Sequence, residues 1–206
     1  MRRRACLAAA GSLLLAGLVP SPAFGTAQPR AGHRPAVWVV GDSVTVFSEG
    51  PVRSALRAAT DGQVEIDAES GRNVLLLDDL VRQQLVRDRL PRTMVLALGT
   101  NPDPSWTRND FRRVVDSIPD SVSVVLVTVY RAPGTAPAWV LRSMADYSRW
   151  MQELAAGRDD VCLAPWRARV KPRAERLTLD GVHPNSRGAD VFARVVAEAV
   201  QRCATD

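Results

Sequence analysis

The pattern of apolar and polar residues along the chain alternates between two kinds of segment. Continuous apolar runs indicate buried strands, whereas apolar residues three and four apart indicate one face of a helix. The expected strands cover residues 37–40, 64–67, 94–98, 122–129 and 161–163. The expected helices cover residues 52–59, 74–88, 109–117 and 139–154, with a last helix that Asn185 or Ser186 can cap at its start.

This alternation predicts an α/β fold. Apolar strands that are separated by helices form a parallel sheet with helices on both faces. The segment 64–67 alternates between apolar and acidic residues, so we expect it near an edge of the sheet. The expected architecture is a three-layer α/β/α sandwich around a five-stranded parallel sheet, with the active site at the carboxyl ends of the strands.

The first 25 residues have the features of an export signal. Three arginines precede an apolar run over 5–19, and small residues stand at the cleavage positions of Ala23-Phe24-Gly25. A retained membrane anchor is the alternative, and the short apolar run disfavours it. We expect residues 1–25 to be a signal peptide, 26–36 a flexible leader and 37–206 the folded domain of a monomer. Export would place it outside the cell or on the exterior of a bacterial envelope, without a stable membrane anchor.

Charge and composition exclude several classes of function. The chain carries a net charge of +5, but removal of residues 1–25 takes three of the 27 basic and none of the 22 acidic residues, leaving +2. Nucleic-acid binding therefore has no support. With His33 in the leader, one histidine remains for a site, and no phosphate loop or dinucleotide motif occurs. We expect neither a metal nor a cofactor.

Two cysteines remain after the expected cleavage, Cys162 and Cys203. A disulfide between them is the default hypothesis for an exported chain. Two separately buried thiols are the alternative, because the sequence does not show how close the two residues lie.

The candidate chemistry lies in two short motifs far apart in the sequence. Ser43 follows the first apolar strand in Gly41-Asp42-Ser43, and Asp180 precedes His183 by three residues in Asp180-Gly181-Val182-His183. An aspartate can accept a hydrogen bond from Nδ1–H of the histidine, which leaves Nε2 free to deprotonate a serine hydroxyl. The chain thus offers a nucleophile, a base and an orienting carboxylate, although each motif by itself is a weak signal.

With Gly71 and with Gly99-Thr100-Asn101, these motifs make the chain resemble the SGNH hydrolases, also called the GDSL esterase/lipase superfamily. The match follows the order of the family's sequence blocks and covers essentially the whole mature chain. The resemblance implies a flavodoxin-like fold, Ser43 as nucleophile, His183 as base and Asp180 as its partner. It also implies an oxyanion hole built from the backbone N–H groups of Ser43 and Gly71 and the side-chain amide of Asn101.

The resulting hypothesis is a secreted serine esterase that hydrolyses short-chain acyl esters, O-acetyl groups above all, on small molecules or on cell-wall or other glycans. The alternatives are a glycan O-acyltransferase with the same triad and a non-catalytic glycan-binding protein with the same fold. The absence of a polytopic membrane segment that would deliver acyl groups favours hydrolysis. Trp106, Trp139 and Trp166 follow strands and are candidates for the substrate cleft, although packing is the more common role for any one of them.

Overall fold

The structure, a computed structural model, describes residues 35–87 and 90–204. The strands are β1 (Val37–Gly41), β2 (Val64–Ala68), β3 (Thr93–Ala97), β4 (Ser123–Val127) and β5 (Val161–Ala164). The helices are α1 (Ser43–Val46), α2 (Glu49–Ala59), α3 (Leu77–Leu85), α4 (Arg108–Ser117), α5 (Ala138–Ala156), α6 (Trp166–Val170), α7 (Ala174–Leu177) and α8 (Ser186–Cys203), with short 3-10 helices η1 (Val74–Leu76) and η2 (Lys171–Arg173).

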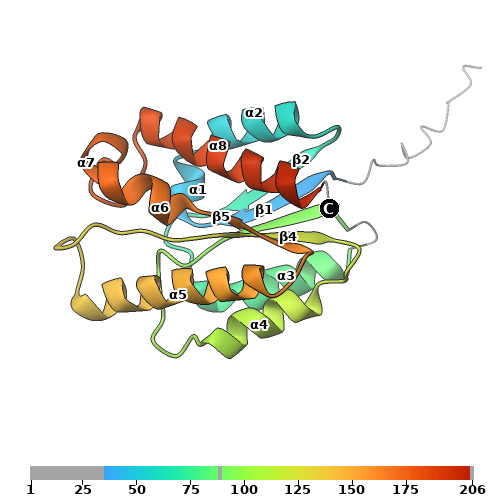
Figure 1. The fold of residues 1–206 in the computed structure, drawn as a ribbon, viewed down its shortest axis with the longest axis horizontal. Helices are drawn as coiled ribbons and strands as arrows, with labels where there is room; N and C mark the ends of the chain where they lie inside the picture. The colour runs from blue at the N-terminus through green and yellow to red at the C-terminus, as the bar shows by residue number, and fades with distance from the viewer. Residues whose placement is uncertain (1–34, 88–89, 205–206) are drawn as a thin grey trace, which may run out of the picture. The chain divides into compact units, whose positions relative to one another are not determined.

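The five strands form one parallel sheet in the order β2-β1-β3-β4-β5. Helices α2 and α8 cover one face, and α3, α4 and α5 cover the other (Figure 1). The predicted α/β/α sandwich with a five-stranded parallel sheet is therefore confirmed, and β2 is an edge strand as its alternating pattern indicated. In this strand order the chain reverses direction across the sheet between β1 and β3, which is where open α/β sheets bind their ligands.

Alternate residues of the inner strands supply the two hydrophobic cores. Val37 and Val39 of β1 pack toward α2 and α8, whereas Trp38 and Val40 pack toward α3, α4 and α5. Successive side chains of a strand point to opposite faces, so a strand that is covered on both sides must be apolar throughout. This requirement explains why the inner strands are visible in the sequence as continuous apolar runs.

Several element boundaries differ from the prediction. The fourth strand was expected over 122–129 but ends at Val127, and the N–H of Val129 donates instead to the hydroxyl of Ser148 on α5 at 3.2 Å. The helix expected over 74–88 starts as η1 and ends, as α3, at Leu85. The segment 166–177, for which no helix was expected, forms α6, η2 and α7, each too short to give a periodic signal.

The ends of the expected organisation are only partly described. The predicted signal peptide and residues 26–34 of the predicted leader lie outside the described residues. Pro35 and Ala36, which we assigned to the leader, are buried, and the N–H of Ala36 donates to the carbonyl of Gln63 at 2.8 Å. The packed domain therefore begins at least two residues before the predicted boundary.

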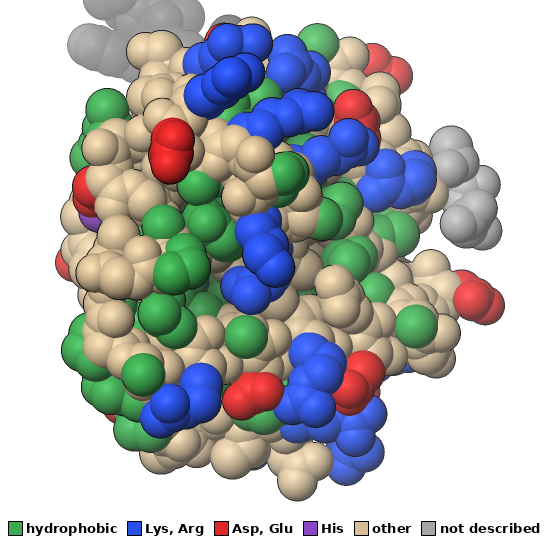
Figure 2. All heavy atoms as spheres, turned by 60° about the vertical axis from the view of Figure 1, so that its left-hand side comes forward, with side chains coloured by type: hydrophobic (Ala, Val, Ile, Leu, Met, Phe, Trp, Pro, Cys, Tyr) green, Lys and Arg blue, Asp and Glu red, His purple; other side chains and the backbone are tan. Residues whose placement is uncertain are grey.

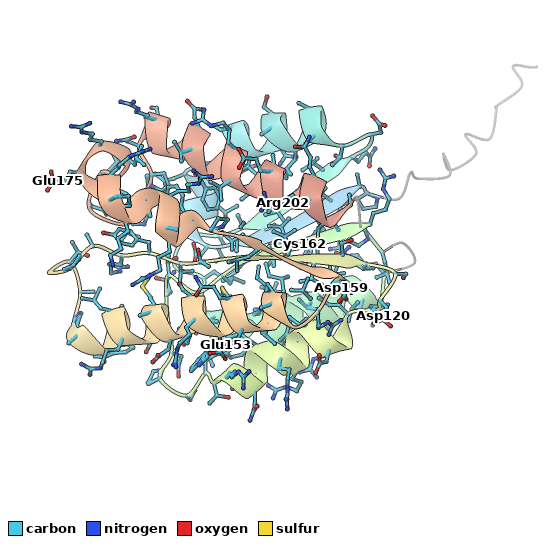
Figure 3. The ribbon with its side chains drawn as sticks, in the orientation of Figure 1. Asp120, Glu153, Asp159, Cys162, Glu175 and Arg202 are labelled. Carbon is cyan, nitrogen blue, oxygen red and sulfur yellow. A yellow bond between two sulfur atoms is a disulfide. The ribbon has the colours of Figure 1, made fainter. Side chains whose placement is uncertain are left out.

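A disulfide joins Cys162 of β5 to Cys203 at the end of α8, with the two Cα atoms 5.7 Å apart. Figure 3 shows Cys162 on β5 beside the last turns of α8. The bond spans a sequence separation of 41 residues and connects an edge strand to the helix that covers it. It therefore restricts the separation of α8 from the sheet.

Replacement of both cysteines by alanine should lower the free energy of unfolding by roughly 3–4 kcal/mol, the loop-closure entropy of a loop of this size. Urea denaturation of the oxidised protein and of the double variant measures this difference. Reduced wild-type protein should unfold at nearly the same urea concentration as the variant. Equal stability of the oxidised wild type and the variant would contradict the prediction.

Candidate active site

Ser43 lies in the turn that joins β1 to the short helix α1. Gly41 permits this turn, because a Cβ atom at this position would lie 2.1 Å from Oγ1 of Thr45. Asp42 caps the helix, and its Oδ1 accepts a hydrogen bond from the N–H of Val44 at 3.1 Å. The tight turn places Ser43, which is 7% exposed, at the carboxyl end of a central strand.

The side chain of Asp42 also connects β1 to the end of β3. Its Oδ2 accepts hydrogen bonds from the N–H of Thr100, at 3.0 Å, and from the hydroxyl of the same residue. Burial raises the pKa of the Asp42 carboxyl, and the hydrogen bonds from Thr100 and Val44 oppose this rise. A fully buried carboxylate with several donors resists displacement, because any movement would leave it without compensation for its lost hydration.

His183 and Asp180 lie in a tight loop over 178–184, just before α8. The N–H of Leu179 donates to the carbonyl of His183 at 2.8 Å and closes the loop. Oδ1 of Asp180 accepts from the N–H of Val182 at 3.0 Å and from the N–H of His183 at 2.8 Å. One carboxylate oxygen is thus used to fold the loop, which leaves the other for the imidazole ring.

The three residues form a continuous hydrogen-bonded series. Oδ2 of Asp180 lies 2.7 Å from Nδ1 of His183, and Nε2 of His183 lies 3.0 Å from Oγ of Ser43. Partial burial by itself would raise the pKa of the Asp180 carboxyl, but the hydrogen bonds from the His183 N–H, the imidazole and the Val182 N–H outweigh it and lower the pKa to about 2. The ionised carboxylate therefore holds the proton on Nδ1 and leaves Nε2 as the acceptor for the serine hydroxyl.

Phe47 is a neighbour of this series that the sequence patterns did not indicate. Its ring stacks on the imidazole of His183 with centroids 4.8 Å apart, and the side chain is 47% exposed. Phe47 follows Ser43 by four residues, which is about one helical turn. This four-residue spacing from Ser43 was the only feature of the sequence that could have indicated that Phe47 lies beside the candidate nucleophile.

The structure brings Gly71 and Asn101 to the same edge of the sheet. The side-chain amide of Asn101 donates to the carbonyl of Arg72 at 3.1 Å, and the carbonyl of Asn101 accepts from the N–H of Val74 at 3.2 Å. The first of these bonds identifies the nitrogen of the amide, whose second hydrogen remains for another acceptor. Gly71 has a φ of +80°, and an added Cβ atom would meet no protein atom within 4 Å. Its backbone conformation, not crowding by the protein, therefore requires glycine.

Arg72 supports this part of the site and was also missed by the sequence patterns. Its guanidinium group donates to the carbonyls of Gly41, at 3.3 Å, and Asp67, at 2.8 Å, and forms an ion pair with the carboxylate of Asp67 at 2.7 Å. Since its own carbonyl accepts the amide of Asn101, one residue ties the loops after β1, β2 and β3 together. An arginine beside a loop glycine carries no signal of such a role in the sequence.

The three candidate tryptophans have different environments. Trp106 and Trp166 are 5% and 1% exposed and belong to the two hydrophobic cores. Trp139, in the first turn of α5, is 43% exposed and lines a hollow of about 360 Å³ together with Asn101. Of the three, only Trp139 therefore borders the candidate site.

Two features are absent from the described residues, 35–87 and 90–204. No group of three or more histidine, cysteine, aspartate or glutamate side chains there is arranged to hold a metal ion. In the same part of the chain, no helix is both long and apolar enough to cross a membrane.

Comparisons with known proteins give matches in structure. No family model and no curated protein sequence matches the chain. The C-terminal catalytic domain of peptidoglycan O-acetyltransferase A (OatA) from Streptococcus pneumoniae superimposes with a TM-score of 0.70 and 25% identity, over 82% of this chain and 94% of that one. A GDSL-like lipase from Parabacteroides merdae gives 0.61 and 17%, over 83% and 97%. An acetyl xylan esterase, Axe2, from Geobacillus stearothermophilus gives 0.58 and 17%, over 84% and 96%.

These neighbours share one fold, and their names describe esterases, lipases and an acetyltransferase. The chain has the same fold as these proteins, and this likeness supports the resemblance to the SGNH hydrolase, or GDSL esterase/lipase, superfamily that the order of the sequence blocks indicates.

Asp42→Asn should destabilise the protein by about 1–3 kcal/mol, because an amide has one acceptor oxygen and would point an N–H₂ group at a buried N–H or hydroxyl donor. Chemical denaturation measures the change. Asp146→Asn, which alters an exposed ion pair on α5, is the matched control and should change stability by less than about 0.5 kcal/mol. Equal effects of the two substitutions would contradict the role assigned to the Asp42 network.

Proposed function

We propose that the protein is a secreted serine esterase that hydrolyses short-chain acyl esters, chiefly O-acetyl groups, on glycans. The observation that carries this proposal is the series Asp180–His183–Ser43, with 2.7 Å and 3.0 Å between successive partners. It lies at the carboxyl edge of the sheet beside β1 and β3, where this class of fold binds ligands. The superfamily and the acyl chemistry in the neighbours' names support the same reaction class.

In the proposed mechanism, Oγ of Ser43 attacks the ester carbonyl carbon while its proton passes to Nε2 of His183. The ionised carboxylate of Asp180 stabilises the imidazolium ion that forms. His183 then gives the proton to the departing alcohol oxygen, which leaves an acyl group on Ser43. A water molecule loses a proton to the same nitrogen, attacks the acyl-enzyme and releases the carboxylic acid.

The oxyanion of each tetrahedral intermediate needs fixed donors. The proposed donors are the N–H groups of Ser43 and Gly71 and the second hydrogen of the Asn101 amide. The N–H of Ser43 opens helix α1, so it has no acceptor within the helix. The hydrogen bond from Asn101 to the Arg72 carbonyl fixes the amide plane before substrate binds, and donors that are fixed in advance stabilise developing charge without reorganisation.

Acyl transfer to a glycan hydroxyl is the second candidate function. The observation that favours it is the likeness to the OatA domain, which has the highest identity of the three neighbours compared above and is named as an O-acetyltransferase. In this reaction a sugar hydroxyl replaces water in the second half of the mechanism. Incubation with p-nitrophenyl acetate in the presence and absence of chito-oligosaccharides separates the two functions. Free acetate supports hydrolysis, and O-acetylated oligosaccharide supports transfer.

Ser43→Ala should abolish turnover of p-nitrophenyl acetate by this mechanism, because the variant lacks the Oγ atom that attacks the ester and carries the acyl group. Circular dichroism and thermal unfolding should be close to those of the wild type, since the hydroxyl contributes one hydrogen bond at the surface of the site. Full turnover by the folded variant would refute the serine-esterase proposal.

Asn101→Ala should lower kcat by about 10²–10³ with a smaller change in KM, since its amide is proposed to bind the oxyanion chiefly in the transition state. Steady-state kinetics with p-nitrophenyl acetate tests the split between the two constants. Asn109→Ala, on the exposed side of α4, is the control and should leave both constants unchanged. If kcat for Asn101→Ala matched that of the wild type, Asn101 would not be an oxyanion donor.

A further inference from the structure

A hollow beside the candidate active site offers a place for the part of the substrate that carries the ester. It has a volume of about 360 Å³ and lies between the segments 100–102 and 131–140. Asn101 forms part of its wall, so the hollow borders the proposed oxyanion donors. The segment over 131–135 also touches the catalytic loop, because the N–H of Ala132 donates to the carbonyl of Gly181 at 2.8 Å.

Trp139 is the largest apolar residue that lines this hollow. Trp139 is 43% exposed, so part of its apolar surface stays in contact with water. A ligand that covered this surface would gain the free energy of removing it from water. A flat, amphipathic aromatic surface suits the C–H face of a pyranose ring, which is apolar while the ring edge carries hydroxyl groups. The other lining residues include short side chains and prolines, Thr135, Ala136 and Pro137 among them.

The polar part of the hollow is the guanidinium group of Arg131. Its Nη1 makes one long hydrogen bond, 3.5 Å, to the carbonyl of Thr135. Its Nε is buried and has no hydrogen-bond acceptor among the described residues, although arginine has five N–H donors to satisfy. Charge-assisted hydrogen bonds between a guanidinium group and a carboxylate are stronger than those to a neutral acceptor, so Arg131 favours an acidic ligand over a neutral one.

A second hollow, of about 700 Å³, is lined by Tyr130, Ala132 and Pro133 and by cationic residues of η2 and α7. The cations are Lys171, Arg173 and Arg176. None of the three forms an ion pair within the described residues, in contrast to Arg82 of α3 and Arg158 before β5.

The face that carries α6 and α7 shows the same excess of positive charge. Lys and Arg side chains gather over its upper part (Figure 2). Glu175 is the one acidic residue that lines the second hollow, and it projects from the outer end of α7 (Figure 3). The segment 130–137 thus has cationic side chains in or beside both hollows that it lines.

We propose that the substrate is an acidic glycan, with one pyranose ring stacked on Trp139 and its carboxylate bound by Arg131. The cations of η2 and α7 attract the rest of the polyanion to the same edge of the sheet. This inference rests on the proposed esterase function and names its substrate class.

The test uses three substrates, namely O-acetylated oligogalacturonate (acidic), O-acetylated xylo-oligosaccharide (neutral) and p-nitrophenyl acetate. Wild type should prefer the acidic glycan. Trp139→Ala should lower kcat/KM on both glycans about tenfold or more, and Trp139→Phe should restore part of the loss. Arg131→Gln should lower kcat/KM about 10–100-fold on the acidic glycan alone, the equivalent of a charge-assisted hydrogen bond. In these variants kcat/KM on p-nitrophenyl acetate should fall by less than kcat/KM on the acidic glycan, because this small ester carries no sugar ring or carboxylate for Trp139 and Arg131 to bind.

The triple variant Lys171→Gln, Arg173→Gln and Arg176→Gln should reduce the salt dependence of kcat/KM on the acidic glycan. Arg82→Gln and Val86→Ala, on α3 and just after it, are matched controls for a lost charge and a trimmed apolar side chain. Both should behave as the wild type on all three substrates.

Direct binding separates this inference from the proposed function. Calorimetry with the Ser43→Ala protein and unesterified oligogalacturonate measures binding without turnover. If the wild type were inactive but the glycan still bound, only the proposed esterase function would be refuted. Binding should weaken when Trp139→Ala or Arg131→Gln is added. The inference is overturned if oligogalacturonate does not bind, if the neutral glycan is the better substrate, or if neither variant differs from the wild type.

Discussion

The buried carboxylate of Asp42 is the interaction on which the candidate site depends. It caps α1 through the N–H of Val44 and accepts two hydrogen bonds from Thr100, and so fixes the ends of β1 and β3 relative to each other. Ser43 and Asn101 are the next residues along the chain from these two anchors. A buried carboxylate must keep its hydrogen-bond donors, because no water replaces them. The hydrogen bonds of Asp42 therefore also fix the distance between Ser43 and the side-chain amide of Asn101.

The loop over 178–184, which carries Asp180 and His183, is also held by hydrogen bonds to a single carboxylate. Asp180 uses one oxygen to fold the loop and the other to hold the ring of His183. Arg72 ties three loops through its guanidinium group and its carbonyl. In each case the polar groups that could serve chemistry are themselves restrained by hydrogen bonds to backbone. A site of this kind is organised before substrate binds, which is the condition for electrostatic stabilisation of a transition state.

The residues that we propose to select the substrate lie outside this centre. The segment 130–137 lines two hollows, one with Trp139 and Arg131 and one with the cations of η2 and α7. The net charge of the chain did not indicate these cations beside the two hollows. Arginines elsewhere, such as Arg82 and Arg158, form ion pairs with nearby carboxylates. The attraction of a charged ligand depends on where cations without an ion-pair partner gather, and not on the net charge of the whole chain.

The sequence by itself determined the fold class, because a sheet that is covered on both faces requires continuous apolar strands, and five such runs stand between amphipathic helices. It also named Ser43, Asp180, His183, Gly71 and Asn101, since short-range motifs place each of them after a strand or before the last helix. The pairing of Cys162 with Cys203 was only one of two alternatives until α8 was seen to pack on β5.

Only the tertiary structure decided which other residues join the site. Phe47 and Arg72 stand in no motif, and their roles arise from contacts with segments that are distant in the sequence. All three tryptophans were candidates for the substrate cleft in the sequence, and burial separated Trp139 from Trp106 and Trp166. Local patterns record which face of an element is apolar, but exposure at a loop depends on every element that packs around it, and that information exists only in the folded chain.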